Sequence, residues 1–225
     1  MEDFMLLAMD SSTQVVGLAL YDGVQVLGEM VWRTQNHHTV ELSPAVNDLM
    51  TRCGVKGRDL RALAVALGPG SFTSLRIGLA LVKGLALALR LPVVGIPTLD
   101  VVAAMQPVSE LPLAAVLQAG RSRLAVGWYR AAAEGWQAEG QASVTTLEAL
   151  FNGLGDAALI CGELGALERQ TLARHKGVLL ASPAQSLRRP AVLAELAWKR
   201  WRAGQMSDVV TLSPIYMSTA DAIPE

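Results

Sequence analysis

Two short polar turns contain the residue types that could bind a phosphate group. The first is Asp10-Ser11-Ser12-Thr13, which ends an apolar run and places a carboxylate beside three hydroxyl groups. Backbone N–H groups and hydroxyls in such a turn can hold a phosphate, and a carboxylate can hold a hydrated Mg²⁺. An ordinary hairpin turn, in which these side chains bond to nearby backbone, is the alternative interpretation.

The second polar turn lies between a buried apolar run and a helical pattern, where phosphate loops occur. It reads Gly68-Pro69-Gly70-Ser71-Phe72-Thr73. The lysine and hydroxyl pair of a P-loop is missing, and no later glycine has the dinucleotide-binding spacing. A glycine turn with Ser71 or Thr73 as the helix N-cap explains the run, so we interpret it as a structural motif.

The spacing of the other reactive side chains does not indicate a metal site or a nucleophile. His37 and His38 are adjacent and His175 is distant, so they do not converge on one metal, and we expect the pair in a solvent-facing loop. Cys53 and Cys161 fit neither a zinc site nor a disulfide framework, and we expect two buried or half-buried thiols. We therefore expect no catalytic residues and no metal ligands in this chain.

One predicted helix, over residues 74–89, has a nearly bare side. Ala80, Gly84 and Ala88 recur every four residues and therefore share one face of the helix. Small residues let another helix backbone approach closely, so either a helix of the same chain or a partner subunit could cover this face. A charged stripe lies beside it: Arg76, Lys83 and Arg90.

The order of the predicted elements indicates an α/β protein with mixed sheets. The first part is predicted to contain strands at 4–9, 15–21 and 24–32, a helix from about 39 to 53 and a strand at 63–67. A helix at 74–89, a strand at 92–96 and a helix from just after Thr98 to 105 follow. After a candidate boundary at 106–111 come strands at 113–118, 124–130 and 157–161, with a polar stretch at 131–140 and a helix at 145–153. A helix at 187–203 and a strand-like segment at 214–217 follow.

Composition limits the classes of function. Of the 225 residues, 52% are hydrophobic and 17% charged, so a large core is available. The net charge of −1 provides no domain-wide positive field for nucleic acid, and we expect another subunit to hold any RNA. Glu2 and Asp3 do not suit a secretory signal, and the apolar stretch 77–89 is shorter than the roughly 20 residues of a membrane span. We expect a cytoplasmic protein.

Four segments resemble the bacterial TsaB family, whose fold belongs to the actin-like, sugar-kinase-like superfamily. They are Met-Leu-Leu-Ala-Met-Asp-Ser-Ser-Thr at 5–13, Gly-Pro-Gly-Ser-Phe-Thr-Ser-Leu-Arg-Ile-Gly at 68–78, Leu-Pro-Val-Val-Gly-Ile-Pro-Thr-Leu-Asp at 91–100 and Pro-Ile-Tyr-Met at 214–217. The resemblance is strong over 5–104, weak through the second lobe, and returns briefly near the C-terminus.

The resemblance implies two actin-like (ribonuclease H-like) lobes, each a mixed sheet with helices. The first would comprise 1–106 with part of 190–217, and the smaller second lobe 107–189. The implied role is a non-catalytic dimerisation subunit that pairs, through helices of its first lobe, with the catalytic paralogue TsaD. That complex transfers a threonylcarbamoyl group to N6 of the adenosine next to the anticodon in ANN-decoding tRNAs.

The same resemblance implies further partners. A TsaE-like ATPase would dock on the pair, the chain alone would form a homodimer, and tRNA would be contacted only through the complex. We expect no cofactor on this chain by itself, and leave open ATP with Mg²⁺ at the interface of the complex. The predicted partner interface is Leu42, Val46, Met50, Arg76, Leu79, Ala80, Lys83 and Gly84.

The sequence also departs from the family pattern. Ser74 stands where the family usually has glycine, and the start of the second lobe lacks the usual acid, base and tyrosine. The departing positions there are Gln118, Gly120, Arg123 and Ala125. An alternative function is a small ATP-dependent phosphotransferase of the same superfamily, which would use Asp10, Ser12 and Thr13 at the phosphates.

Overall fold

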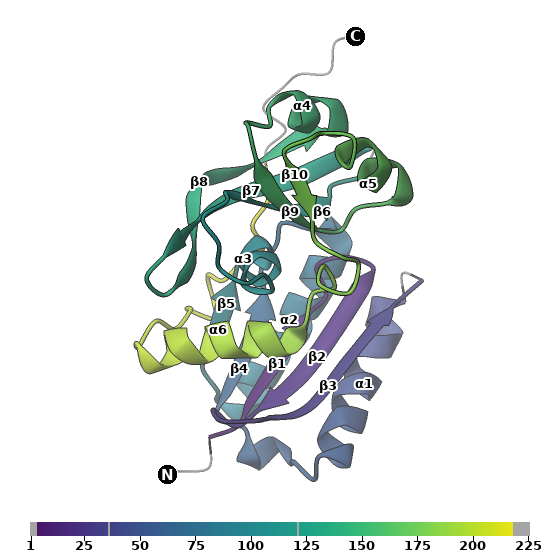
Figure 1. Cartoon of the computed structure of the whole chain (residues 1–225). Helices are drawn as coiled ribbons and strands as arrows, with labels where there is room; N and C mark the ends of the chain where they lie inside the picture. Colours follow the sequence, from purple (N-terminus) through teal and green to yellow (C-terminus); the bar gives the residue numbers. More distant parts are fainter. Residues whose placement is uncertain (1–3, 36, 121, 218–225) are drawn as a thin grey trace. The chain divides into compact units, whose positions relative to one another are not determined.

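The computed structural model describes residues 4–35, 37–120 and 122–217 (Figure 1). The chain forms two compact units. The first comprises residues 4–101 together with Arg188–Ile215, and the second comprises Val102–Leu187. Each unit contains one five-stranded sheet with both parallel and antiparallel neighbours. The predicted α/β fold with two mixed sheets and helices is confirmed.

In the first unit, a three-stranded meander continues into two parallel strands. Its strands are β1 (Leu6–Asp10), β2 (Val15–Tyr21), β3 (Val26–Arg33), β4 (Ala62–Ala66) and β5 (Val93–Ile96), in the order β3-β2-β1-β4-β5. Its helices are α1 (His38–Arg52), the 3-10 turn η1 (Gly57–Asp59), α2 (Phe72–Leu89) and α6 (Pro190–Arg202), and α3 (Thr98–Ala104) starts in this unit. The pairs β1–β2 and β2–β3 are antiparallel, whereas β1–β4 and β4–β5 are parallel.

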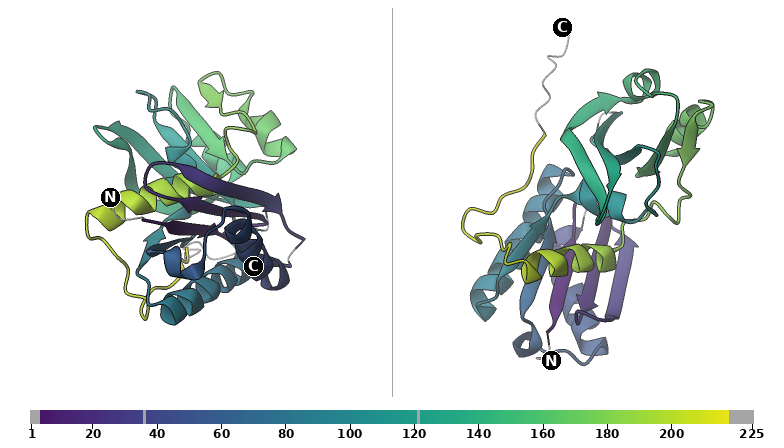
Figure 2. Two further views of the ribbon diagram at one scale, coloured as in Figure 1. Left: turned by 90° about the horizontal axis from the view of Figure 1, so that it is seen from below. Right: turned by 60° about the vertical axis from the view of Figure 1, so that its left-hand side comes forward.

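Helices cover both faces of this sheet. Successive side chains of a strand point to opposite faces, so Leu7 and Met9 of β1 pack with α1 and α2, and Leu6 and Ala8 pack with α6. Figures 1 and 2 show α6 on one face of the sheet and α1 and α2 on the other. Burial on both faces explains why β1 and β4 are apolar at almost every position.

Helix α2 is the longest helix among the described residues, with 18 residues. By length and composition alone it could cross a membrane, which is weak evidence because core helices pass the same test. Its buried side, which includes Leu75, Leu79 and Val82, packs on the sheet of the first unit.

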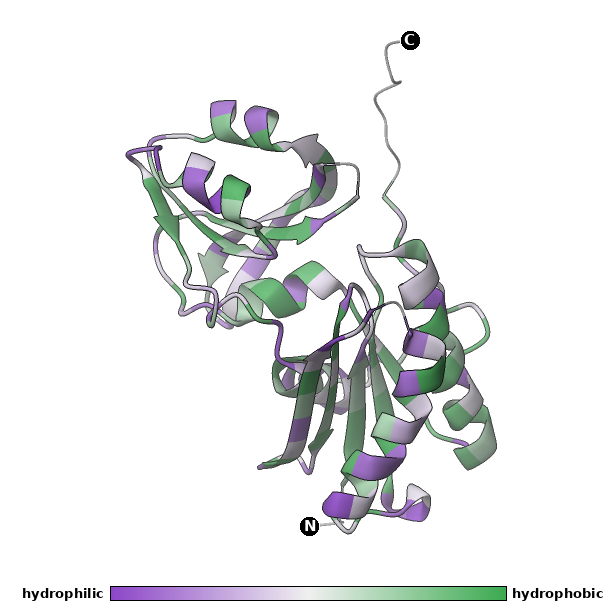
Figure 3. Ribbon diagram, turned by 90° about the vertical axis from the view of Figure 1, so that its right-hand side faces the viewer, coloured by the Kyte–Doolittle hydropathy of each residue, from purple (hydrophilic) through white to green (hydrophobic). Residues whose placement is uncertain are grey.

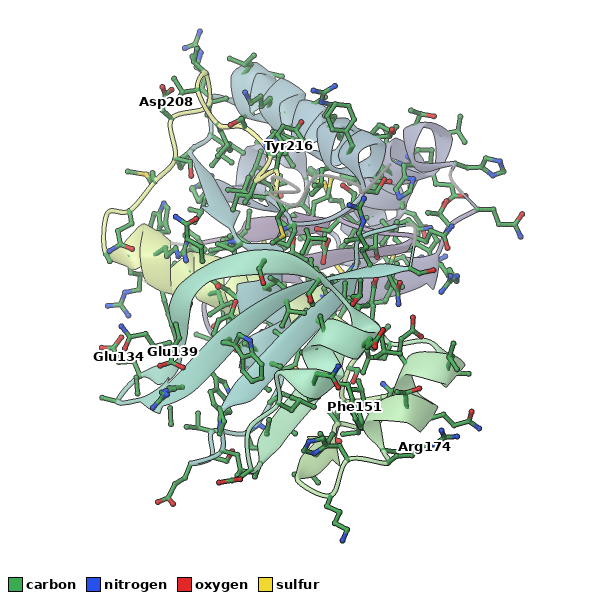
Figure 4. All side chains as sticks on the ribbon, turned by 90° about the horizontal axis from the view of Figure 1, so that it is seen from above. Glu134, Glu139, Phe151, Arg174, Asp208 and Tyr216 are labelled. Carbon is green, nitrogen blue, oxygen red and sulfur yellow. The ribbon has the colours of Figure 1, made fainter. Side chains whose placement is uncertain are left out.

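The second unit repeats the strand order of the first. Its strands are β6 (Leu113–Gln118), β7 (Arg123–Ala132), β8 (Gly135–Thr146), β9 (Ala158–Gly162) and β10 (Val178–Leu180), in the order β10-β9-β6-β7-β8. Its helices are α4 (Leu147–Asn152) and α5 (Ala166–Leu172). Leu150 of α4 and Leu172 of α5 close a core over one face of this sheet. Phe151 of α4 meets His175 edge to face, with ring centroids 5.3 Å apart (Figure 4).

Several sequence-based predictions of elements were wrong. The polar stretch 131–140 contains the end of β7 and the first half of β8. Most side chains of β8 are exposed, so this edge strand lacks the alternating apolar and polar residues by which a half-buried strand is recognised. Glu139 in β8 pairs with Arg130 in β7. Helix α5 and strand β10 were not predicted because both are very short. The segment 214–217 is not a strand; Ile215 donates one backbone hydrogen bond to Leu67.

Two glycines of α2 allow a matched test of this packing. A Cβ at Gly78 would overlap Ser11 Oγ, whereas a Cβ at Gly84 would meet no atom within 4 Å. Alanine is a better helix former than glycine, so Gly84→Ala should raise the stability of the first unit by about 1 kcal/mol. Gly78→Ala should instead lower it, by about 1–3 kcal/mol, because overpacking outweighs the helix preference. Thermal unfolding of both variants against the unmodified chain measures the difference, and a gain at both positions would contradict the packing described.

Candidate functional site

A buried ion pair lies at the end of β1. Arg188 Nε donates to Asp10 Oδ2 at 2.7 Å, and both side chains are almost completely buried. The second arm of the same guanidinium donates to Thr13 Oγ1 at 2.8 Å and to the Val15 carbonyl at 3.0 Å. Asp10 Oδ1 accepts the backbone N–H of Ser12 at 2.8 Å. The pair is therefore supported by hydrogen bonds on both partners, as a buried pair requires.

The other residues of the first polar turn connect it to helices. Ser11 Oγ donates to the Ser74 carbonyl of α2 at 2.9 Å. Ser12 Oγ lies 2.7 Å from Thr98 Oγ1 at the start of α3. His38 Nε2 in α1 lies 3.0 Å from the Thr13 carbonyl. The turn Asp10–Thr13 is thus a junction between β1, β2 and three helices.

The two polar turns of the sequence pack against each other. Ser71 N donates to the Ser12 carbonyl at 2.7 Å, and a Cβ at Gly70 would overlap that carbonyl, so only glycine fits. Thr98 binds the second turn through two hydrogen bonds. Its Oγ1 accepts from Gly68 N at 2.9 Å, and its backbone N–H donates to the Gly68 carbonyl at 2.8 Å.

The second turn also starts α2. Ser71 is the N-cap, and its Oγ accepts from Ser74 N at 3.4 Å and from Ser74 Oγ at 3.0 Å. Ser74, which replaces the usual family glycine, therefore reinforces the cap. In this structure Gly68–Thr73 packs against the first polar turn and caps α2.

Both turns are thus occupied by contacts within the first unit. The oxygens of Asp10 bond to Arg188 and to the backbone, and the hydroxyls of Ser11, Ser12 and Thr13 bond to other groups of the same unit. A phosphate would have to displace these contacts. The geometry therefore gives no support to an ATP-dependent phosphotransferase built on this turn.

Sequence reasoning missed three residues of the junction. Arg188 lies 178 positions from Asp10, and the only signal for it was that a carboxylate ending a buried strand needs a cation. Thr98 was seen only as the start of a helix. The prediction for His38 was wrong: its ring is buried against the Thr13 carbonyl, whereas His37 remains exposed. Adjacent helical residues point in different directions, which separates the pair.

The structure divides the predicted partner interface into core and surface residues. Leu42, Val46 and Leu79 are buried in the core between the sheet and its two helices, and Met50 packs partly against it. The prediction that Leu42, Val46 and Leu79 contact a partner was wrong. Apolar residues at helical spacing suggest an interface, but here they pack α1 and α2 onto their own sheet. The remaining members are accessible: Arg76, Ala80 and Gly84 are exposed and Lys83 is half-buried.

We call the exposed side of α2 the outer face, which comprises Phe72, Arg76, Ala80, Gly84, Leu87 and Ala88. Phe72 is 54% exposed and Leu87 71% exposed. The guanidinium carbon of Arg76 lies 3.6 Å from the centre of the Phe72 ring. Figure 3 shows α1 and α2 next to each other, with hydrophobic colour along much of α2.

The segment after α6 borders this outer face. Lys83 Nζ donates to the Val210 carbonyl at 3.2 Å, so this lysine of the predicted charged stripe is held by the chain itself. Asp208, labelled in Figure 4, accepts from the backbone N–H of Val210 and from the Thr211 hydroxyl. These bonds, that of Val210 foremost, lower the pKa of the Asp208 carboxyl. Val209 and Leu212 pack against the core under α1 and α2.

The residues of the second unit that depart from the family pattern lie around the β6–β7 turn. Gln118 Nε2 donates to the Glu163 carbonyl at 3.4 Å and to Glu168 Oε1 at 3.2 Å. Gly120 has a positive φ of 71°, and its carbonyl accepts from Arg123 N. Ala125 is buried opposite Val144 of β8. Within the described ranges, no three or more His, Cys, Asp or Glu side chains lie close enough to hold a metal ion.

Comparison with known proteins agrees with this fold. A family model described as "TsaD: tRNA N6-adenosine threonylcarbamoyltransferase" matches residues 26–171. The tRNA threonylcarbamoyladenosine biosynthesis protein TsaB of Bacillus subtilis is 33% identical over 125 residues, which are 56% of this chain and 55% of that protein. The Escherichia coli protein of the same name is 42% identical over 96 residues, which are 42% of this chain and 40% of that protein.

The chain belongs to the TsaB (YeaZ) family. A solved structure of YeaZ from Pseudomonas aeruginosa superposes with a TM-score of 0.79 at 26% identity, covering 95% of this chain and 99% of that one. The sequence match spans about half the length of the curated TsaB relatives, whereas the structural match covers nearly the whole of the YeaZ chain. The YeaZ fold therefore extends over nearly the whole chain, beyond the part that the sequence match with the curated relatives covers.

Adjacent arginines offer a test of the junction. Arg188→Ala should lower stability by about 3–5 kcal/mol, because it leaves the Asp10 carboxylate buried without its cation. Arg189 pairs with Glu29 on the surface and its side chain is 53% exposed, so Arg189→Ala should cost at most about 1 kcal/mol. Urea unfolding of the two variants compares them directly. Equal losses would show that the buried pair does not hold the unit together.

Proposed function

We propose that this chain serves the biosynthesis of threonylcarbamoyladenosine in tRNA as a non-catalytic subunit. In this proposal, the exposed sides of α1 and α2 pair with a TsaD-like threonylcarbamoyltransferase, the paralogue named by the matching family model. Membership of the TsaB family supports the pathway, because the curated relatives carry it in their names. The observation that carries the pairing is the outer face of α2.

The outer face combines exposed apolar side chains with a flat backbone surface. Phe72 and Leu87 present large apolar groups, and Ala80, Gly84 and Ala88 leave the helix backbone nearly bare between them. Among the described residues, no atom outside the neighbouring backbone of α2 lies within 4 Å of the place where a Gly84 Cβ would stand, so this flat strip is open there. Contiguous exposed apolar surface of this kind is typical of an interaction site.

Helix α1 extends the same surface. It contacts α2 on the shared face of the sheet, and Val40 near its start is 67% exposed. Two neighbouring helices with a small-residue strip can pack against two helices of a partner, since small residues allow the backbones to approach to the short end of the usual interaxial distance. A partner with a related two-helix face, such as a paralogue, fits this surface, and so does a second copy of the chain.

We assign the transfer chemistry to the partner. In this chain the candidate phosphate turn is engaged by Arg188, Thr98 and α2, which makes it a structural junction. The proposal has four further parts. A TsaE-like ATPase docks on the pair, and ATP with Mg²⁺ binds at the interface. The chain contacts tRNA only through the complex, and the complex works in the cytoplasm.

Gly84→Leu tests the pairing without disturbing the fold. Leucine has room at this site and is a better helix former than glycine, so the isolated chain should be as stable as before or gain about 1 kcal/mol. The added side chain should hold the partner helix away, and co-purification with the TsaD-like paralogue should fall at least about tenfold, which corresponds to 1.4 kcal/mol.

The matched control is Gly155→Leu in the second unit, where a Cβ also meets no atom within 4 Å. This variant should co-purify as the unmodified chain does. Undiminished complex formation by Gly84→Leu would contradict the role of the outer face, and a loss with both variants would point to an effect unrelated to it.

The pathway is tested separately in cells. Deleting the gene for this chain should remove threonylcarbamoyladenosine from total tRNA, as measured by mass spectrometry of the nucleosides. Supplying the unmodified chain or Gly155→Leu should restore it, and Gly84→Leu should restore it poorly because the complex is weakened. Modified adenosine that persists after deletion would refute the pathway, whatever the outcome of the co-purification.

A further inference from the structure

A pocket of about 800 Å³ lies in the first unit, away from both the polar junction and the outer face of α2. The residues that precede β1 line it, whereas the junction follows the last residue of β1. Its size falls within the range of small-molecule sites. The lining side chains that matter here are Phe4, Asp22, Arg61, Trp198, Trp201 and Arg202.

Aromatic rings form one wall of this pocket. Trp198 and Trp201 of α6 are stacked, with ring planes 12° apart and centroids at 5.2 Å. Phe4 lies 4.1 Å from the first indole and 4.4 Å from the second. Neither indole N–H donates a hydrogen bond to another residue that the structure describes.

The turn between β2 and β3 fits closely against this wall. A Cβ at Gly23 would lie 2.9 Å from the Trp198 ring, and the φ of Gly23 is +91°, so glycine is required for both reasons. The adjoining Asp22 uses Oδ1 to accept the N–H groups of Val24 and Gln25. Its carboxylate therefore stabilises its own turn.

Two arginines supply positive charge at the pocket. Arg61 donates from one terminal nitrogen to the carbonyls of Arg58 and Leu60, which positions its guanidinium and leaves its other N–H groups for a ligand. Arg202 lies with its guanidinium carbon 5.8 Å from the centre of the Trp198 ring. Both side chains are exposed, so an incoming anion can reach them.

We propose that this pocket binds a nucleotide. The base stacks on the aromatic wall, since every base has a π-face for an aromatic side chain. The phosphate pairs with Arg61 and Arg202, whose forked N–H groups match a phosphate oxygen pair. A free nucleotide and an unpaired nucleotide of an RNA strand present the same chemistry, and the pocket accepts either source. This binding does not depend on the pairing through α1 and α2.

Calorimetric titration of the full chain tests the proposal with three probes: AMP, adenosine and the tetranucleotide of adenylate. We expect the phosphate-bearing probes to bind with a dissociation constant of about 0.01–1 mM, and adenosine more weakly. The Arg61→Ala/Arg202→Ala double variant should weaken binding at least about tenfold, because charge-assisted hydrogen bonds are lost. Trp201→Leu, which keeps an apolar group in place, should weaken all three probes alike.

The matched control is Arg33→Ala/Arg174→Ala, which removes the same charge from exposed positions whose side chains do not line the pocket. It should bind within about twofold of the unmodified chain, since distant surface charges are screened. Binding of AMP would show that a free nucleotide suffices, and binding of the tetranucleotide alone would assign the site to RNA. The proposal is overturned if no probe binds, or if the pocket variants bind as well as the control.

Discussion

The buried pair of Asp10 and Arg188 is the constraint on which the first unit depends. It joins the end of the first strand to a residue two positions before α6, so the two segments of the unit are connected across 178 positions of sequence. A buried charge is costly unless its partner and its remaining hydrogen bonds are in place, and here the guanidinium also bonds to Thr13 and Val15. The turn held in this way presents the Ser12 carbonyl to Ser71, which fixes where α2 begins.

The start of α2 in turn decides which of its sides faces outward. With Ser71 as N-cap and Gly78 against Ser11, the helix has one rotation on the sheet, which buries Leu75, Leu79 and Val82. The opposite side, with Gly84 at its middle, is left exposed and nearly flat. The polar junction therefore sets the position of the outer face.

The sequence allowed the strands and helices of the first unit to be predicted, since long apolar periods and strong turn residues such as Gly68 and Ser71 set them. It did not distinguish the faces of α1 and α2, because Leu42 and Leu79 follow the same helical period whether they meet a sheet or a partner. Nor could it reveal Arg188, His38 or the aromatic wall around Trp198. Those depend on contacts between residues far apart in the chain, which no local pattern encodes.

The second unit shows what changes when the central charge is absent. Its sheet has the same order, and Gln118 ends β6 as Asp10 ends β1. A neutral amide is less costly to bury than a carboxylate, and Gln118 is satisfied by the Glu163 carbonyl and Glu168 without any buried arginine. The helix between its two parallel strands, α5, has 7 residues, against 18 in α2. A helix of two turns cannot offer a long flat strip, so the proposed pairing through helices is assigned to the first unit.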